Sequence, residues 1–295
     1  MDILMITYPL SALLAAAAAL GIAVYITRKL NLGFRLWWIG AATFVLSQVG
    51  HIPFNSLATR LFANGTLPVP SPEWSPLFNA VFLGLSAGLW EELSRYAMFR
   101  WWAKDARSWG KAVLTGAGHG GIEALLFGTG AILLTYFNMV ALRGVDLSTV
   151  VPPAQVALAQ QQVAAYWNAS WLASLLPFIE RVFAMVVQIS LAVIVAQTFI
   201  RRQWFWLWLA VLWHAIIDGI GVYILYTYGA QGNMVYIIEG IVGLIALISL
   251  GIIFALRSPE PPEEPSPEQA PIQPVDVTGL EVKVTDENLE GTKYQ

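Results

Sequence analysis

Residues 77–99 read LFNAVFLGLSAGLWEELSRYAMF, a long apolar stretch that contains Glu91, Glu92 and Arg95. A bilayer-spanning helix needs about 20 mostly apolar residues. Helices are the default form inside lipid because an unpaired backbone group is costly there. Each ionisable side chain inside such a helix costs about 2.5–3.5 kcal/mol on insertion scales and marks a candidate functional site. The stretch therefore predicts both a membrane helix and a charged site within it.

The composition of the whole chain agrees with a membrane protein. Only 12% of the 295 residues are charged and 57% are hydrophobic, whereas soluble domains carry about 25% charged residues. The 13 Trp point the same way, because Trp collects at membrane interfaces. The absence of Cys excludes disulfide frameworks, Cys-ligated metal sites and thiol nucleophiles. No feature of the chain suggests nucleic acid binding.

The predicted fold is an all-α, polytopic membrane helix bundle of about seven transmembrane helices. The predicted spans are residues 3–27, 34–54, 77–99, 112–137, 172–200, 203–227 and 234–256. They form a membrane domain over residues 1–257, with long connections at 55–76 and 138–171. We expect the second connection to contain a short amphipathic helix on the outer surface. Residues 258–295, which are rich in Pro and acidic side chains, predict a disordered cytoplasmic tail.

The basic residues predict the orientation of the bundle. Ten of the 16 follow the first, third, fifth and seventh predicted spans, namely Arg28, Lys29, Arg35, Arg100, Lys104, Arg107, Lys111, Arg201, Arg202 and Arg257. The other connections hold only Arg60 and Arg143. Basic residues concentrate in cytoplasmic loops. The pattern therefore places the N-terminus outside and the C-terminus inside.

Three predicted spans each carry an acid–base pair four residues apart. The pairs are Glu91 with Arg95, His119 with Glu123, and His214 with Asp218, and Glu92 lies beside the first. Residues at this spacing share one face of a helix. At about 1.5 Å per residue, the three pairs lie within about two helical turns of one another in depth. We therefore expect the three polar faces to meet in one cavity, open to the cytoplasmic half of the bilayer.

This set of residues suits general-base hydrolysis. A carboxylate in a low-dielectric setting can take a proton from water. Two histidines can hold that water or stabilise an oxyanion, and Arg95 offsets the charge of two adjacent glutamates. The glycines around His119 allow another backbone to approach closely, which serves either a substrate strand or helix packing.

The remaining charged residues of the spans have structural interpretations. His51, near the outer end of the second predicted span, is interpreted as interfacial. Glu180 and Arg181 are adjacent, which favours a structural ion pair. Glu239 is interpreted as a structural or interfacial hydrogen-bonding residue.

The motifs resemble those of the glutamic intramembrane proteases. Glu-Glu-x-x-Arg at 91–95, the Gly-flanked His119 and His-x-x-x-Asp at 214–218 occur in the same order on separate helices. That superfamily includes the CAAX-prenyl endopeptidases, the bacteriocin-processing proteins and the PrsW proteases. The run Gly-His-Gly-Gly-Ile-Glu at 118–123 looks most like the YhfC branch, whose members are named intramembrane metalloproteases. The resemblance covers roughly residues 78–220.

The resemblance implies a role for each motif residue. Glu91 matches the glutamate that activates water, with Glu92 in support and Arg95 orienting or neutralising the pair. His119 matches the histidine that helps hold the water. His214 and Asp218 match the motif that stabilises the oxyanion. Glu123 is a candidate supporting residue.

The chain departs from the superfamily pattern at three positions. Arg95 follows the second Glu by three residues, as in the PrsW-like pattern, and not by four as in the CAAX-type pattern. Thr115 stands where many members have an aromatic residue, and Asp218 where several carry Asn. An ionised Asp218 is a poor oxyanion donor, so this residue either carries a proton or orients His214.

Metal dependence and the class of function each leave an alternative open. His119, His214 and Glu91 are ligand types that bind zinc with an open position, but the His-Glu-x-x-His arrangement is lacking. We therefore favour a metal-free glutamic mechanism over a zinc one. The rival functions are a proton-coupled transporter or channel, and a non-catalytic membrane scaffold or immunity protein. For a protease, the expected partners are a membrane protein or lipidated peptide substrate and the bilayer of a prokaryotic cytoplasmic membrane.

Overall fold

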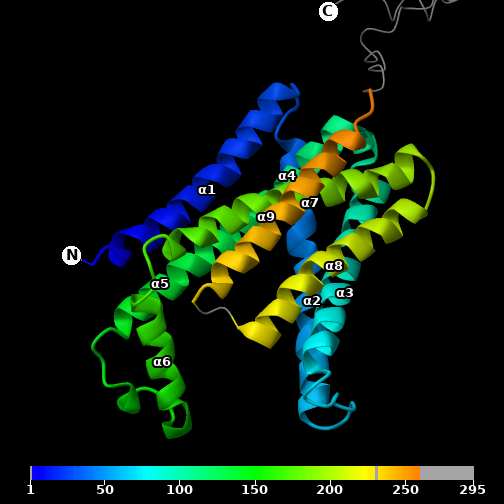
Figure 1. Ribbon diagram of the computed structural model, residues 1–295. Helices are drawn as coiled ribbons and strands as arrows, with labels where there is room; N and C mark the ends of the chain where they lie inside the picture. Colours follow the sequence, from blue (N-terminus) through cyan, green and yellow to red (C-terminus); the bar gives the residue numbers. More distant parts are fainter. Residues whose placement is uncertain (1, 230–231, 260–295) are drawn as a thin grey trace, which may run out of the picture. The chain divides into compact units, whose positions relative to one another are not determined.

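The computed structural model describes residues 2–229 and 232–259, and these contain helices and no strand. The α-helices are α1 Leu4–Lys29, α2 Arg35–Ala63, α3 Ser75–Ala97, α4 Trp109–Glu123, α5 Ala131–Ala141, α6 Val156–Trp167, α7 Leu176–Ile200, α8 Phe205–Tyr228 and α9 Met234–Ala255 (Figure 1). Two π-helical segments, Met98–Trp102 and Ala124–Gly130, follow α3 and α4. The predicted all-α class is confirmed. The predicted disordered tail falls almost wholly outside the described residues.

Five of the described helical segments are long and apolar enough to cross a membrane. They are Leu4–Lys29, Trp109–Ala141, Ala173–Ile200, Phe205–Tyr228 and Met234–Ala255. The second segment joins α4 and α5 through the π-helical turn between them. The predicted spans 34–54 and 77–99 also lie in long helices, α2 and α3, which carry more polar side chains. The count of seven spans and their orientation stay predictions.

The first long connection differs from the predicted one, whereas the second contains the helix that was predicted for it. Helix α2 continues to Ala63, well beyond the predicted end at residue 54. Residues 55–63 are mixed polar and apolar, and the ring of Phe62 packs edge-on against Phe78 of α3 at 5.4 Å between centroids. The second connection contains the predicted short helix, α6. The ring of Tyr166 on α6 stacks on Tyr8 of α1 at 4.1 Å, which ties the connection to the bundle.

Helix α7 lies at the centre of the packing. It contacts α1, α3, α4, α8 and α9, and every residue from Val187 to Thr198 is buried. The closest helix pairs are α3 with α8, α2 with α4 and α4 with α7. These pairs place α2, α3, α4, α7 and α8 side by side around one interior, which is where the charged residues of the sequence lie.

Glycines permit the close approach of α2 and α4. A Cβ atom on Gly118 would lie 2.0 Å from the backbone oxygen of Trp37, and one on Gly40 would lie 1.9 Å from that of Thr115. Gly116 is packed in the same way against the backbone of Ile189 on α7, at 2.7 Å. Helix packing is therefore the reason for these glycines, and this packing brings His119 into the interior.

Replacing Gly118 by Ala is expected to destabilise the protein. The added methyl meets backbone, which cannot move aside as a flexible side chain can, and overpacking of this kind costs about 1–3 kcal/mol or more. Gly21→Ala in α1 is the matched control, because no atom lies within 4 Å of its added Cβ. Thermal unfolding in detergent should show a lowered midpoint for the Gly118 variant only. Equal midpoints for the two variants would contradict this account of the α2–α4 contact.

Candidate active site

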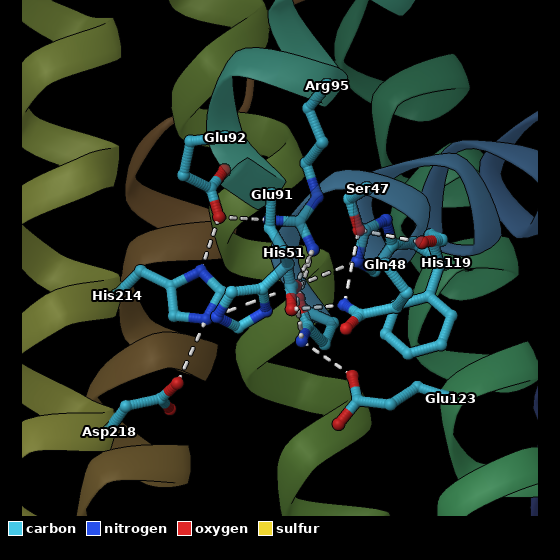
Figure 2. A network of polar contacts seen from close by, with 12 residues as sticks. Ser47, Gln48, His51, Glu91, Glu92, Arg95, His119, Glu123, His214 and Asp218 are labelled. Atoms are coloured by element: carbon cyan, nitrogen blue, oxygen red, sulfur yellow. Dashed lines mark hydrogen bonds and ion pairs between the residues drawn. The ribbon is translucent and has the colours of Figure 1, made fainter. Parts of the chain in front are cut away.

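Five helices contribute side chains to one network of charged and polar residues (Figure 2). Glu91, Glu92 and Arg95 come from α3, His119 and Glu123 from α4, and His214 and Asp218 from α8. Gln48 and His51 of α2 and Gln188 of α7 complete the set. The three charged motifs of the sequence thus meet in one place, as their depths predicted.

Glu91 lies at the centre of the network. Its Oε1 accepts a hydrogen bond from Gln48 Nε2 at 3.1 Å. Its Oε2 lies 3.0 Å from His119 Nε2 and 3.7 Å from the Arg95 guanidinium. The same oxygen lies 4.0 Å from His214 Nε2. The Glu91 side chain is only 8% exposed, so its charge is offset by these donors and not by bulk solvent.

Glu92 is fully buried and has a different set of partners. One of its oxygens forms an ion pair with Arg95 and accepts a hydrogen bond from His214 Nδ1 at 2.6 Å. The other ring nitrogen of His214 lies 3.4 Å from the Asp218 carboxylate. An imidazole donates from both nitrogens only in its cationic form. The geometry therefore suits a positively charged His214 held between Glu92 and Asp218.

His119 and Glu123 both lie on α4, but each contacts a side chain of another helix. Among the contacts of the described residues, His119 pairs with Glu91 on α3, and Glu123 accepts a hydrogen bond from Gln188 Nε2 at 2.6 Å. The α2–α4 packing presses the His119 ring edge-on against Phe44, with 5.1 Å between ring centroids. The ring then points across the bundle and not along its own helix. The other two pairs, Glu91 with Arg95 and His214 with Asp218, form as predicted.

Gln48 and Gln188 belong to the network although sequence reasoning missed them. Gln188 Oε1 accepts a hydrogen bond from Arg95, and its Nε2 lies 3.5 Å from Glu91 in addition to its bond to Glu123. Neutral amides do not stand out by charge. The available signal was a Gln in the middle of the apolar run 183–196, since a buried amide costs free energy unless it is hydrogen-bonded.

The interpretation of His51 as interfacial stays a prediction, and the structure adds contacts that the sequence did not indicate. Because α2 extends to Ala63, His51 lies well inside the helix and is half-buried. Its Nε2 lies 3.2 Å from Ser86 Oγ of α3 and 2.9 Å from Asn55 Nδ2.

A second ion-pair group adjoins the network. Arg181 pairs with Glu180, as the sequence predicted, and also lies 3.4 Å from Glu123. The Arg181 stem packs over Gly128, where an added Cβ would lie 2.6 Å from its Cγ. Gly128 belongs to the π-helical turn that begins directly after Glu123, and such turns occur often at functional sites. Glu123 therefore connects Gln188 to Arg181.

The comparison with protein families decides where this network belongs. Residues 11–242 match the family described as YhfC intramembrane metalloprotease, and this range contains every member of the network. The chain belongs to the YhfC family. It is also 30% identical over 254 residues to the uncharacterized membrane protein YhfC of Bacillus subtilis strain 168, across 82% of this chain and 92% of that protein. No solved structure matches the chain.

Family membership and the apolar helices establish an integral membrane protein. The Bacillus relative agrees with the prokaryotic origin expected from the sequence. The description of the YhfC family supports a protease and includes the prefix "metallo". The side chains of the network are therefore compared with the ligands and distances that a metal ion requires.

The donor set of this YhfC-family chain does not fit a zinc ion in the described arrangement. Among the residues that the structure describes, no group of three or more His, Asp or Glu side chains is placed to share a metal. Zinc needs its ligand atoms at about 2.0–2.2 Å from one point. Here both glutamates face Arg95, and His119 and His214 direct ring nitrogens at carboxylates. The guanidinium of Arg95 lies between the carboxylates of Glu91 and Glu92 and supplies the positive charge that a metal ion would otherwise provide.

Proposed function

We propose that this YhfC-family protein is an intramembrane protease of the glutamic type, in which Glu91 activates a water molecule. The observation that carries the proposal is the position of Glu91, nearly buried and surrounded by His119, His214 and Arg95. The substrate class is a membrane-associated protein or a lipidated peptide. The proposal includes seven membrane spans, with the N-terminus outside and the C-terminus inside.

The reacting water lies next to Glu91 and His214. Glu91 Oε2 and His214 Nε2 are 4.0 Å apart, which is too long for a direct hydrogen bond, so the water is held by Glu91 beside the charged imidazole ring. Glu91 takes a proton from this water as the water oxygen bonds to the carbonyl carbon of the substrate. The carboxylic acid then returns that proton to the departing amine nitrogen as the C–N bond breaks. The step needs no further reactant.

The neighbouring residues stabilise the charges of this reaction. A cationic His214, held by Glu92 and Asp218, lies where negative charge develops on the substrate oxygen. This role for Asp218 is to orient and charge His214, which explains why an Asp can stand where several glutamic proteases carry Asn. Arg95 pairs more closely with Glu92 than with Glu91, from which its guanidinium lies 3.7 Å, so Glu91 is the carboxylate available to act as the base.

Cleavage is expected to continue in the presence of metal chelators. The purified protein in detergent is mixed with a panel of fluorophore-tagged transmembrane peptides, with and without EDTA or 1,10-phenanthroline. Because the carboxylates are paired with Arg95 and with histidines, removal of metal should change the rate less than twofold. Loss of cleavage on chelation, restored by added zinc, would instead establish a metalloprotease and overturn the glutamic mechanism. No cleavage of any peptide by the wild-type protein would count against a protease.

A further inference from the structure

The network is closed at the end of the bundle that carries the basic residues. At this end Glu92 is 0% and Arg95 1% exposed. Met98 and Phe99, in the π-helical segment directly after α3, are also buried. The continuously buried segment of α7, Val187–Thr198, runs from Gln188 toward Arg201 at the same end. No charged side chain of the network reaches solvent in this direction.

Exposure rises toward the opposite end on three different helices. On α8, Asp218 lies one turn beyond His214 and its side chain is 42% exposed, against 4% for His214. On α7, Glu180 precedes Gln188 by two turns and is 41% exposed. On α4, Glu123 lies one turn beyond His119 and is 17% exposed. Figure 2 shows Asp218 and Glu123 on one edge of the network, with Arg95 and Glu92 on the other.

The packing explains this gradient. In helix α8 the buried residues end at Ala215, although the helix continues to Tyr228. In α7, none of residues 177–184 is buried, and α5 contains no buried residue. The hydrophobic core thus fills the half of the bundle that includes the basic ends of the helices. Among the described residues of the other half, buried side chains occur on α1, for example at Tyr8 and Ala12, but α5 has none and α8 has none beyond Ala215.

We propose that the site opens toward the end of the outer loops 64–74 and 142–172, through an entrance formed by Glu123, Glu180, Arg181 and Asp218. Water reaches Glu91 through this entrance. Resting on the proposed protease function, the inference also assigns the substrate class: membrane proteins whose scissile bond is presented from the outer half of the bilayer. An opening to the cytoplasmic half, as the sequence suggested, would require a path through the buried residues around Arg95.

The natural absence of Cys makes the entrance directly testable with single-cysteine variants. Asp218→Cys and Glu180→Cys report the entrance, and Gln197→Cys, at a position only 1% exposed, reports the closed end. Ser71→Cys marks the outer loops and Lys104→Cys marks the basic end, since both positions are exposed. Each variant is checked for folding by gel filtration and thermal unfolding. The probe is a charged, membrane-impermeant methanethiosulfonate reagent, added to intact cells and to inverted membrane vesicles.

Asp218→Cys and Glu180→Cys are expected to react from the same side as Ser71→Cys, at least tenfold faster than Gln197→Cys. Reaction from the Lys104→Cys side, alone or in addition, would overturn the proposal, and so would no reaction from either side. If the two markers exchange sides, the orientation is inverted, yet Asp218→Cys must still react together with Ser71→Cys. Labelling needs no proteolysis. A chain that labels as expected but cleaves nothing would keep the entrance and lose the proposed function.

Discussion

Glu91→Gln is expected to lower the rate of peptide cleavage about 10³-fold, within the range that general-base catalysis supplies. The amide keeps the size of the side chain and a hydrogen-bonding oxygen for Gln48, but it cannot take a proton from water. The change acts on the chemical step, so the loss should appear in kcat with little change in KM. The measurement is cleavage of the same tagged transmembrane peptides by purified wild-type and variant proteins.

Two comparisons make the result specific to Glu91. Glu73→Gln changes an exposed acid in the loop between α2 and α3 and should leave the rate within twofold of wild type. The protein has only three His, and all three lie in the network. Nitrogen NMR of ¹⁵N-histidine should therefore show the two rings nearest Glu91, those of His119 and His214, perturbed and the His51 ring retained. Cleavage by Glu91→Gln at the wild-type rate would remove Glu91 from the mechanism.

Arg95→Gln is expected to cost about 3–5 kcal/mol of stability, because it leaves two buried carboxylates without their cation. Arg95 is the fully buried guanidinium that pairs with Glu91 and Glu92, and it also donates to Gln188. For a protein of this size, the change corresponds to a fall in the unfolding midpoint on the order of 10 °C. Thermal unfolding in detergent and the yield of folded protein measure the effect.

A second substitution separates loss of charge balance from loss of side-chain volume. Adding Glu92→Gln to Arg95→Gln removes one of the uncompensated carboxylates, so the double variant should regain part of the lost stability. Arg60→Gln, at an exposed position near the end of α2, is the control and should melt as wild type does. If the double variant is less stable than Arg95→Gln alone, the ion-pair explanation fails.

Much of the site could be predicted because charge inside an apolar helix needs a compensating partner. This reasoning selected Glu91, Glu92, Arg95, His119, His214 and Asp218, and the structure brings all six together. It did not find Gln48 or Gln188, because a neutral amide is not distinguished by charge from other polar residues in the sequence. The predicted second span ended at residue 54, whereas helix α2 extends to Ala63, where Phe62 packs against Phe78 of α3.

The sequence by itself determined the class of the molecule and which side chains needed partners. Apolar runs as long as a bilayer is thick, with a backbone that must satisfy its own hydrogen bonds, leave a helical membrane protein as the outcome. Only the tertiary structure decided which side chains pair with each other. His119 pairs with Glu91, 28 positions away, and not with Glu123 on its own helix. Helix rotation and close packing at glycines choose among the partners, and we propose that the end of the bundle with fewer buried residues sets where the site meets solvent.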